Sequence, residues 1–164
     1  MATGEAVPAS STSRSSPDGF TPRDLEIVSL LAVGREMRDI SNQLGITENT
    51  VKQHLRMLYL RHEIREGNKE VRLVIHFLNS PIAPPPEPVY RTIADWNLTP
   101  RESQIVEKIT QGLTSQQIGD ELGTSEQTVK NWFCSIFEKA GCENRAQLVA
   151  QVINERRFKQ STVQ

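Results

Sequence analysis

The chain has 164 residues, a formal net charge of −1 and a mean hydropathy of −0.45, so it can hold one ordinary domain or two very small ones. No apolar run approaches the roughly 18 residues that a membrane span needs, and the N-terminal stretch lacks the apolar region of a secretory signal. These bounds exclude a membrane-spanning protein and predict a cytoplasmic one, and the lack of excess positive charge means that any DNA-binding surface must gather its cations locally.

Residues 1–17 are rich in Ser, Ala, Thr and Pro without apolar periodicity, which predicts a disordered tail. Two segments, residues 18–79 and 98–158, align without gaps at an offset of 78. The stretch FTPRDLEIVSLLAVG pairs with LTPRESQIVEKITQG, and ISNQLGITENTVK pairs with IGDELGTSEQTVK. We interpret the two segments as copies of one unit that arose by duplication.

Each unit is predicted to form four short helices. The first begins at Thr21 or Thr99, where a capping hydroxyl is followed by Pro and, three residues after the cap, by an acid. The second ends at a glycine turn, and Thr47 or Ser125 then caps the third. A fourth helix is predicted over about residues 68–78 and 144–156. A short helix, a tight glycine turn and a second helix form a helix-turn-helix, so the predicted fold class is all-α.

Residues 80–97 join the two units, and five prolines in their first nine positions predict an extended, semi-rigid linker. The part that ends near Trp96 is expected to form a short turn against a neighbouring helix, and residues 159–164 are expected to form a C-terminal tail. At roughly 3.1 Å per residue the linker reaches about 55 Å, whereas two major-groove sites one turn apart are separated by about 34 Å. One chain can therefore place both units on DNA.

The third helix of the first unit has an apolar and a polar face. Val51 and Leu55 recur at helical spacing and predict the core face, whereas Lys52, Gln53 and Arg56 lie on the other side near the helix start. Recognition helices contact base edges with such residues, because Lys and Arg pair with guanine and Gln pairs with adenine. An ordinary solvated face is the alternative interpretation, but the repeat and its glycine turn favour contact with DNA.

The second unit keeps only part of this polar edge, because Cys134 takes the place of Arg56. Residues 52–65 hold four basic side chains against one acidic, a net of +3, whereas residues 126–141 hold two of each. The first unit is therefore predicted to be the stronger reader of DNA, that is, the unit that makes more contacts with bases in the major groove. The candidate DNA-contacting residues are Thr50, Lys52, Gln53, Arg56, Thr128, Lys130 and Asn131.

Other conspicuous side chains have structural interpretations. Trp132 and Phe133 either fill the core or form a patch for protein contact, and both alternatives stay open. Cys134 and Cys142 fit neither a disulfide framework nor a zinc pattern and are interpreted as structural thiols. The three histidines do not converge as metal ligands would. We therefore expect no metal, no cofactor and, without a nucleophile–base pair or paired carboxylates, no enzymatic activity.

The pattern L-T-P-R-E…I…G-x-[ST]…I…L-x-[ST]-E-x-T-V-K resembles the LuxR/FixJ-type (GerE-like) helix-turn-helix domain of bacterial transcription regulators, through residues 98–130 and 21–56. The resemblance implies a third helix that enters the major groove, a fourth that commonly supports dimerisation, and DNA contact by Lys52, Gln53 and Arg56. Cys134 departs from the basic or polar residue often found at its position. Family members usually carry a receiver or ligand-binding domain ahead of one such unit, so their mode of control does not transfer to two copies.

The function predicted from these features is a sequence-specific regulator of transcription that binds double-stranded DNA. The alternative is a helix-turn-helix-derived module that binds another regulator or a subunit of RNA polymerase. We expect the fourth helices to pair, either within one chain as a pseudo-dimer or between two chains as a homodimer. The expected contacts are Val71, Val74, Ile75, Leu78, Val149, Val152 and Ile153.

Overall fold

The computed structural model describes residues 18–88 and 91–163, and these residues form an all-helical fold without a β-strand, as predicted. The tail expected over residues 1–17 lies outside the described residues, as do residues 89–90 of the linker and residue 164. The helices are α1 Pro22–Ala32, α2 Met37–Leu44, α3 Glu48–Arg61, α4 Lys69–Leu78, the 3-10 helix η1 Ile93–Trp96, α5 Pro100–Ile109, α6 Ser115–Leu122, α7 Glu126–Ala140 and α8 Arg145–Thr162.

The first helix of each unit begins at a reciprocal pair of hydrogen bonds. The Thr21 hydroxyl accepts from the Asp24 N–H (3.2 Å) while the Asp24 carboxylate accepts from the Thr21 N–H (2.9 Å). Thr99 and Glu102 make the same pair at 3.2 and 2.7 Å. Each pair satisfies helix-terminal donors that would otherwise lack a partner, so the spacing of Thr, Pro and acid sets where the helix begins.

A glycine ends the second helix of each unit and turns the chain into the third. Gly45 and Gly123 have φ angles of 64° and 66°, the left-handed region that favours glycine. A side-chain carbon there would meet nothing within 4 Å, so the requirement for glycine is one of backbone conformation. Thr47 and Ser125 then accept hydrogen bonds from the backbone N–H of Thr50 and Thr128, each at 3.1 Å, which fixes the start of α3 and α7.

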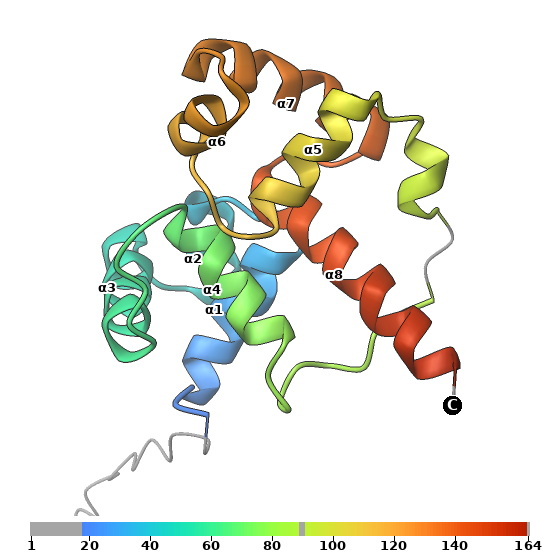
Figure 1. The fold of residues 1–164 in the computed structure, drawn as a ribbon. Coiled ribbons are helices and arrows are strands. Elements are labelled where there is room, and N and C mark those ends of the chain that lie inside the picture. Colours follow the sequence, from blue (N-terminus) through green and yellow to red (C-terminus); the bar gives the residue numbers. More distant parts are fainter. Residues whose placement is uncertain (1–17, 89–90, 164) are drawn as a thin grey trace, which may run out of the picture.

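Figure 1 shows α4 and α8 side by side in the middle of the molecule, with α1 beside them and α3 and α7 further out. The apolar residues of α4 and α8 belong to one continuous core with the inner faces of α1, α3, α5 and α7. Of the residues expected to pair the units, Ile75 is half-buried, and the buried ones are Val71, Val74, Leu78, Val149, Val152 and Ile153.

The segment between the units touches the second of them. Residues 84–88 have no regular secondary structure, and the Pro84 carbonyl accepts a hydrogen bond from Arg157 of α8 (3.0 Å). The 3-10 helix η1 lies where a short turn was expected, and Trp96 at its end is only 3% exposed and packs in the core. Helix α8 continues to Thr162, past the boundary expected at residue 158. Among the described residues, no helix combines the length and the apolar character needed to cross a membrane.

Candidate nucleic-acid interface

The polar edge of α3 is open to solvent. Lys52, Gln53 and Arg56 are all exposed, and the two cations form no ion pair with any described residue. They lie in the first two and a half turns of a helix whose N-terminal N–H groups also favour a nearby anion. On the opposite face, Val51 and Leu55 are buried, as their spacing predicts. Two cations and an amide of α3 are therefore available to a ligand from solvent, and contact with them does not involve the core.

A buried carboxylate holds α3 against α1. The Asp24 carboxylate, only 3% exposed, is hydrogen-bonded to His54 Nδ1 at 2.9 Å and to Arg61 Nη1 at 3.1 Å, and both residues belong to α3. Burial raises the pKa of Asp24, but the hydrogen bonds from Thr21, His54 and Arg61 outweigh it and keep the pKa below the ordinary 3.8. Because His54 lies between Gln53 and Arg56 in the sequence, this contact also fixes the rotation of the polar edge.

The role of Arg61 corrects the charge count made from the sequence. Its guanidinium donates to the Gly19 carbonyl as well as to the Asp24 carboxylate, so its charge is already compensated within the protein. Of the basic residues between 52 and 65, Lys52, Arg56 and Arg65 remain exposed without an ion pair among the described residues. The cationic surface of the first unit is thus smaller than the sequence indicates: Lys52 and Arg56 lie on α3, and Arg65 lies in the loop that follows it.

The second unit has an equivalent anchor with different chemistry. Glu102, only 4% exposed, accepts from Ser135 Oγ and from Lys139 Nζ, both at 2.7 Å and both from α7. Burial raises the pKa of Glu102, yet the hydrogen bonds from Lys139, Ser135 and Thr99 lower it to about 2. These two anchors were missed from the sequence, although a signal was present: Asp24 and Arg61 recur as an acid and a base at the same offset in the second copy.

The polar edge of α7 is exposed but partly engaged with its own helix. Lys130 Nζ lies 2.8 Å from Glu126 Oε1, and Asn131 Oδ1 accepts a hydrogen bond from Gln127 Nε2 at 3.0 Å. Each neighbour is one turn earlier, at the helix start. Any ligand of Lys130 or Asn131 must compete with these contacts. Exposed pairs of this kind are weak, about 0.3–0.5 kcal/mol, so the competition is modest.

The aromatic pair of α7 divides between the two interpretations left open by the sequence. Phe133 is 2% exposed and belongs to the core, whereas Trp132 is half-buried with the Arg101 guanidinium 5.5 Å from its ring centre. The prediction of two structural thiols holds for Cys142, which is buried and whose pKa burial raises to about 11, but it is wrong for Cys134. Cys134 is exposed, because one turn of helix separates it from Lys130 on the outer face.

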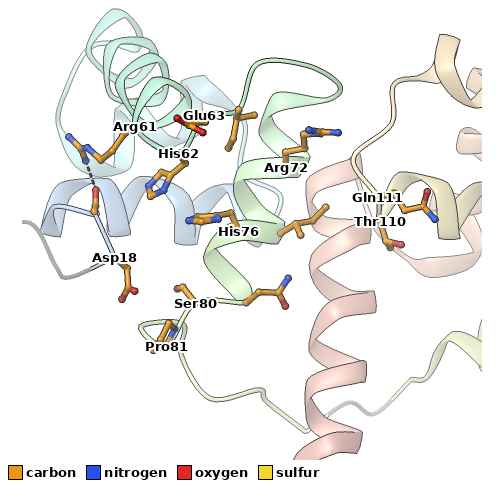
Figure 2. A pocket seen from close by; sticks show the side chains of 14 residues that line it. Asp18, Arg61, His62, Glu63, Arg72, His76, Ser80, Pro81, Thr110 and Gln111 are labelled. Carbon is orange, nitrogen blue, oxygen red and sulfur yellow. Dashed lines mark hydrogen bonds between the residues drawn. The ribbon is translucent and has the colours of Figure 1, made fainter.

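Two histidines line a groove away from the polar edge of α3. Figure 2 shows His62 at the end of α3 and His76 on α4. Their ring centres are 4.3 Å apart, and both residues line a cavity of about 960 Å³. Burial lowers the pKa of His62, and the charges of His76 and Arg61 lower it further. Among residues 18–88 and 91–163, no group of three or more His, Cys, Asp or Glu side chains is arranged to hold a metal ion.

The comparisons with known proteins match the parts of the chain that contain these helices. The family model for bacterial regulatory proteins of the luxR family matches residues 18–68 and 96–152. The spore germination protein GerE of Bacillus subtilis is 36% identical over 34% of this chain and 76% of its own length. The transcriptional regulatory protein DegU of Brevibacillus brevis is 38% identical over 34% of this chain and 24% of its own length.

A further match, the response regulator Rre1 of Synechocystis, is 28% identical over 53% of this chain and 36% of its own length. The chain therefore spans well under half of DegU and Rre1 but about three quarters of GerE. No solved structure matches the chain.

Proposed function

The chain belongs to the luxR family of bacterial regulatory proteins, and on that premise we propose that it is a sequence-specific DNA-binding transcription regulator in which α3 is the stronger reader. The observation that carries the proposal is the exposed edge of α3, a helix anchored through Asp24. Lys52, Gln53 and Arg56 lie on this edge, and neither cation forms an ion pair within residues 18–88 and 91–163. The protein acts by binding, and we assign it no catalytic step and no cofactor.

The chemistry of this edge suits the major groove. Lys52 and Arg56 each donate toward the O6 and N7 acceptors of guanine, and Gln53 pairs with adenine through N6 and N7. The Thr50 hydroxyl, 2.9 Å from the Thr47 hydroxyl at the helix start, is placed for a phosphate. In this proposal, the contact of Thr50 with a phosphate positions the helix on DNA, and the contacts of Lys52, Gln53 and Arg56 with bases determine the sequence that is bound.

Helix α7 is the weaker reader in this proposal. Lys130 and Asn131 keep a cation and an amide, and Thr128 keeps the hydroxyl that corresponds to that of Thr50, 2.8 Å from the Ser125 hydroxyl. Cys134 cannot replace the guanidinium, and Lys130 and Asn131 must first leave Glu126 and Gln127. The second unit therefore adds affinity and orientation more than base discrimination.

The fourth helices pair the two units. The apolar residues of α4 and α8 pack together within one chain, which favours an intrachain pseudo-dimer over a homodimer formed through the same faces. Besides DNA, we propose RNA polymerase or another regulator as a second partner, which would bind a surface other than the one that contacts DNA. Both partners follow from the proposed role in transcription.

Two observations favour the alternative function, a module that binds another regulator or a polymerase subunit. Trp132 is half-buried on α7, and the basic and acidic side chains of residues 126–141 balance, so this helix could face a protein as well as DNA. In that case the helix-turn-helix frame serves as a scaffold for a protein contact.

A salt titration separates the two functions. Fluorescence anisotropy of labelled DNA fragments, taken from a genomic selection with the full chain, gives the dissociation constant at several salt concentrations. DNA binding predicts a linear loss of log affinity with log salt, with a slope of about −0.9 for each neutralised phosphate. Absence of specific fragments in the selection, with salt-independent retention of a protein partner, would establish the alternative.

A further inference from the structure

Two reciprocal contacts join the units. The Gly34 carbonyl, after α1, accepts a hydrogen bond from the side-chain amide of Asn144 (2.8 Å), and Asn144 is the N-cap of α8. The Gly112 carbonyl, after α5, accepts from the backbone N–H of Asn68 (2.9 Å), and Asn68 is the N-cap of α4. Gly34 and Gly112 occupy the same position in the two copies. In each unit, the glycine turn that follows the first helix thus contacts the N-cap of the other unit's fourth helix.

Backbone conformation and close neighbours both favour glycine at these two turns. Their φ angles are 87° and 81°, and a side-chain carbon on Gly34 would lie 2.9 Å from Gln147 of α8. A side-chain carbon on Gly112 would overlap Arg72 of α4. Figure 2 shows Arg72 on the side of α4 that faces Thr110, at the end of α5. A side chain at either turn would therefore force Gln147 or Arg72 to move, in addition to straining the backbone.

Reciprocal contacts of this kind indicate an approximate two-fold axis. In an isologous interface the same patch occurs on both sides, so a contact from the first unit to the second is matched by its reverse. The glycine turns and the helix N-caps meet this condition, and α4 and α8 pack against each other between them. The symmetry is approximate, because α1 itself also packs against α8 whereas α5 approaches α4 through the turn that follows it.

We infer that the two units form an internal dimer about this axis, so that one chain occupies an inverted pair of unequal half-sites at one fixed spacing. This inference rests on the proposed DNA-binding function, since it specifies the DNA that the two helices read together. The symmetry of a dimer is mirrored in its operator, and a rigid junction fixes the distance between half-sites. The apolar faces of the fourth helices are already buried, so a second chain has no free face there.

The difference between the half-sites follows from three aligned pairs of residues. Lys52 corresponds to Lys130, and Gln53 corresponds to Asn131, so both half-sites have a position read by a cation and one read by an amide. Arg56 corresponds to Cys134, so a guanine is specified at the third position of one half-site only. The operator is an inverted repeat whose symmetry fails at that position.

The experiment is a selection from random DNA with the full chain, followed by measurements on synthetic sites. We expect selected sequences with inverted half-sites at one spacing and one chain bound to each pair, counted by mass photometry. Insertion of 5 base pairs, about half a helical turn, moves one half-site to the opposite side and should remove the contribution of the second unit. A preference for direct repeats, a tolerance of the insertion or two chains on each pair would overturn the inference.

These outcomes differ from failure of the proposed function, in which no sequence is selected at all. A variant tests the unequal position directly. Cys134→Arg changes an exposed residue and should make the second half-site prefer the same guanine as the first, with about tenfold discrimination. Ser103→Arg is the matched control, because it adds the same charge at an exposed site on α5. Unchanged symmetry of the selected sequences in Cys134→Arg would contradict the assignment.

Discussion

Helices α3 and α7 begin in the same way and present different surfaces. In both, a hydroxyl of the N-cap accepts from the third N–H, and the following valine (Val51 or Val129) is buried. Their exposed edges differ. Lys130 is paired with Glu126, whereas Lys52 has no ion pair with any residue that the structure describes, and the exposed guanidinium of Arg56 is replaced by the exposed thiol of Cys134. The cap and the core determine where the helix lies. The exposed positions determine what it can bind, and they have changed without disturbing the rest.

The carboxylates that hold the two helices also differ in their partners while the position of the helix is kept. Asp24 holds α3 through an imidazole and a guanidinium, while Glu102 holds α7 through a hydroxyl and an ammonium group. A carboxylate bound by several donors fixes the rotation of a helix in either case. Different donor groups thus give the same placement.

The largest expected effect is on DNA affinity and distinguishes the polar edge of α3 from that of α7. The double variant Lys52→Ala/Arg56→Ala should weaken binding to a selected operator by roughly a hundredfold, since each base contact contributes about 1–3 kcal/mol. Lys130→Ala/Asn131→Ala should weaken it by less than about tenfold, because those side chains exchange contacts within the helix for contacts with DNA. Equal losses in a mobility-shift titration would show that the two helices read DNA equally well.

The next effect concerns the anchors. Glu102→Gln should lower the free energy of unfolding by about 2 kcal/mol, the size expected for a buried charged hydrogen-bond acceptor. Asp24→Asn should destabilise by a smaller amount, because the depression of the pKa to about 2 marks Glu102 as the more strongly stabilised carboxylate. Urea unfolding measures both, with the exposed pair Glu107→Gln and Asp39→Asn as controls. A larger loss in Asp24→Asn than in Glu102→Gln would reverse the ranking.

A smaller effect depends on pH and should originate in the first unit. The pKa of His62 is lowered on folding, so the unfolded chain binds its proton more readily and stability is lost as the pH falls below about 6.5. The loss between pH 7.5 and 5.5 should be small, because His62 is only partly buried, and it should be absent in His62→Gln. Glu102 contributes only below about pH 4.5, as its carboxylate becomes protonated. An undiminished loss in His62→Gln would assign the effect to other groups.

The smallest effect tests the ion pair on α7. Glu126→Gln frees Lys130 and should strengthen operator binding by about twofold more than Glu48→Gln does. Glu48 is the matched control, because it occupies the same place on α3, and no ion pair joins it to Lys52 in the part of the chain that the structure describes. Anisotropy titrations at low salt resolve this difference. Equal gains would mean that the negative charge acts on DNA directly and that the pair is irrelevant.

Local features were predictable from the sequence because their causes are local. The caps at Thr21 and Thr99 and the glycine turn at Gly45 depend on residues three or four positions apart. The buried stripe of α3 follows from helical periodicity, and the all-α class follows from the same pattern found twice. In each case the physical requirement is contained within one or two turns of chain.

Contacts between distant residues were not predictable in the same way. Arg61 was counted as part of a cationic surface because nothing near it in the sequence shows that Asp24 receives it. Cys134 was interpreted as structural because it fits neither a disulfide nor a zinc pattern, and its exposure depends on how α7 is rotated against α5, which the sequence does not show. Helix α8 extends to Thr162 through a polar stretch that lacks a core-facing pattern, where the Arg157 contact to the linker supplies support.

The junction built on Gly34 and Gly112 also bears on how the protein can change over generations. In a homodimer one codon specifies both halves, so a substitution in the recognition helix alters both half-sites and its energetic cost is doubled. Here each half has its own codons, and Arg56 and Cys134 can diverge while the turns that join the units stay glycine. On the proposed function, a regulator of this type acquires a new operator one half at a time, with the unaltered half holding it on the DNA.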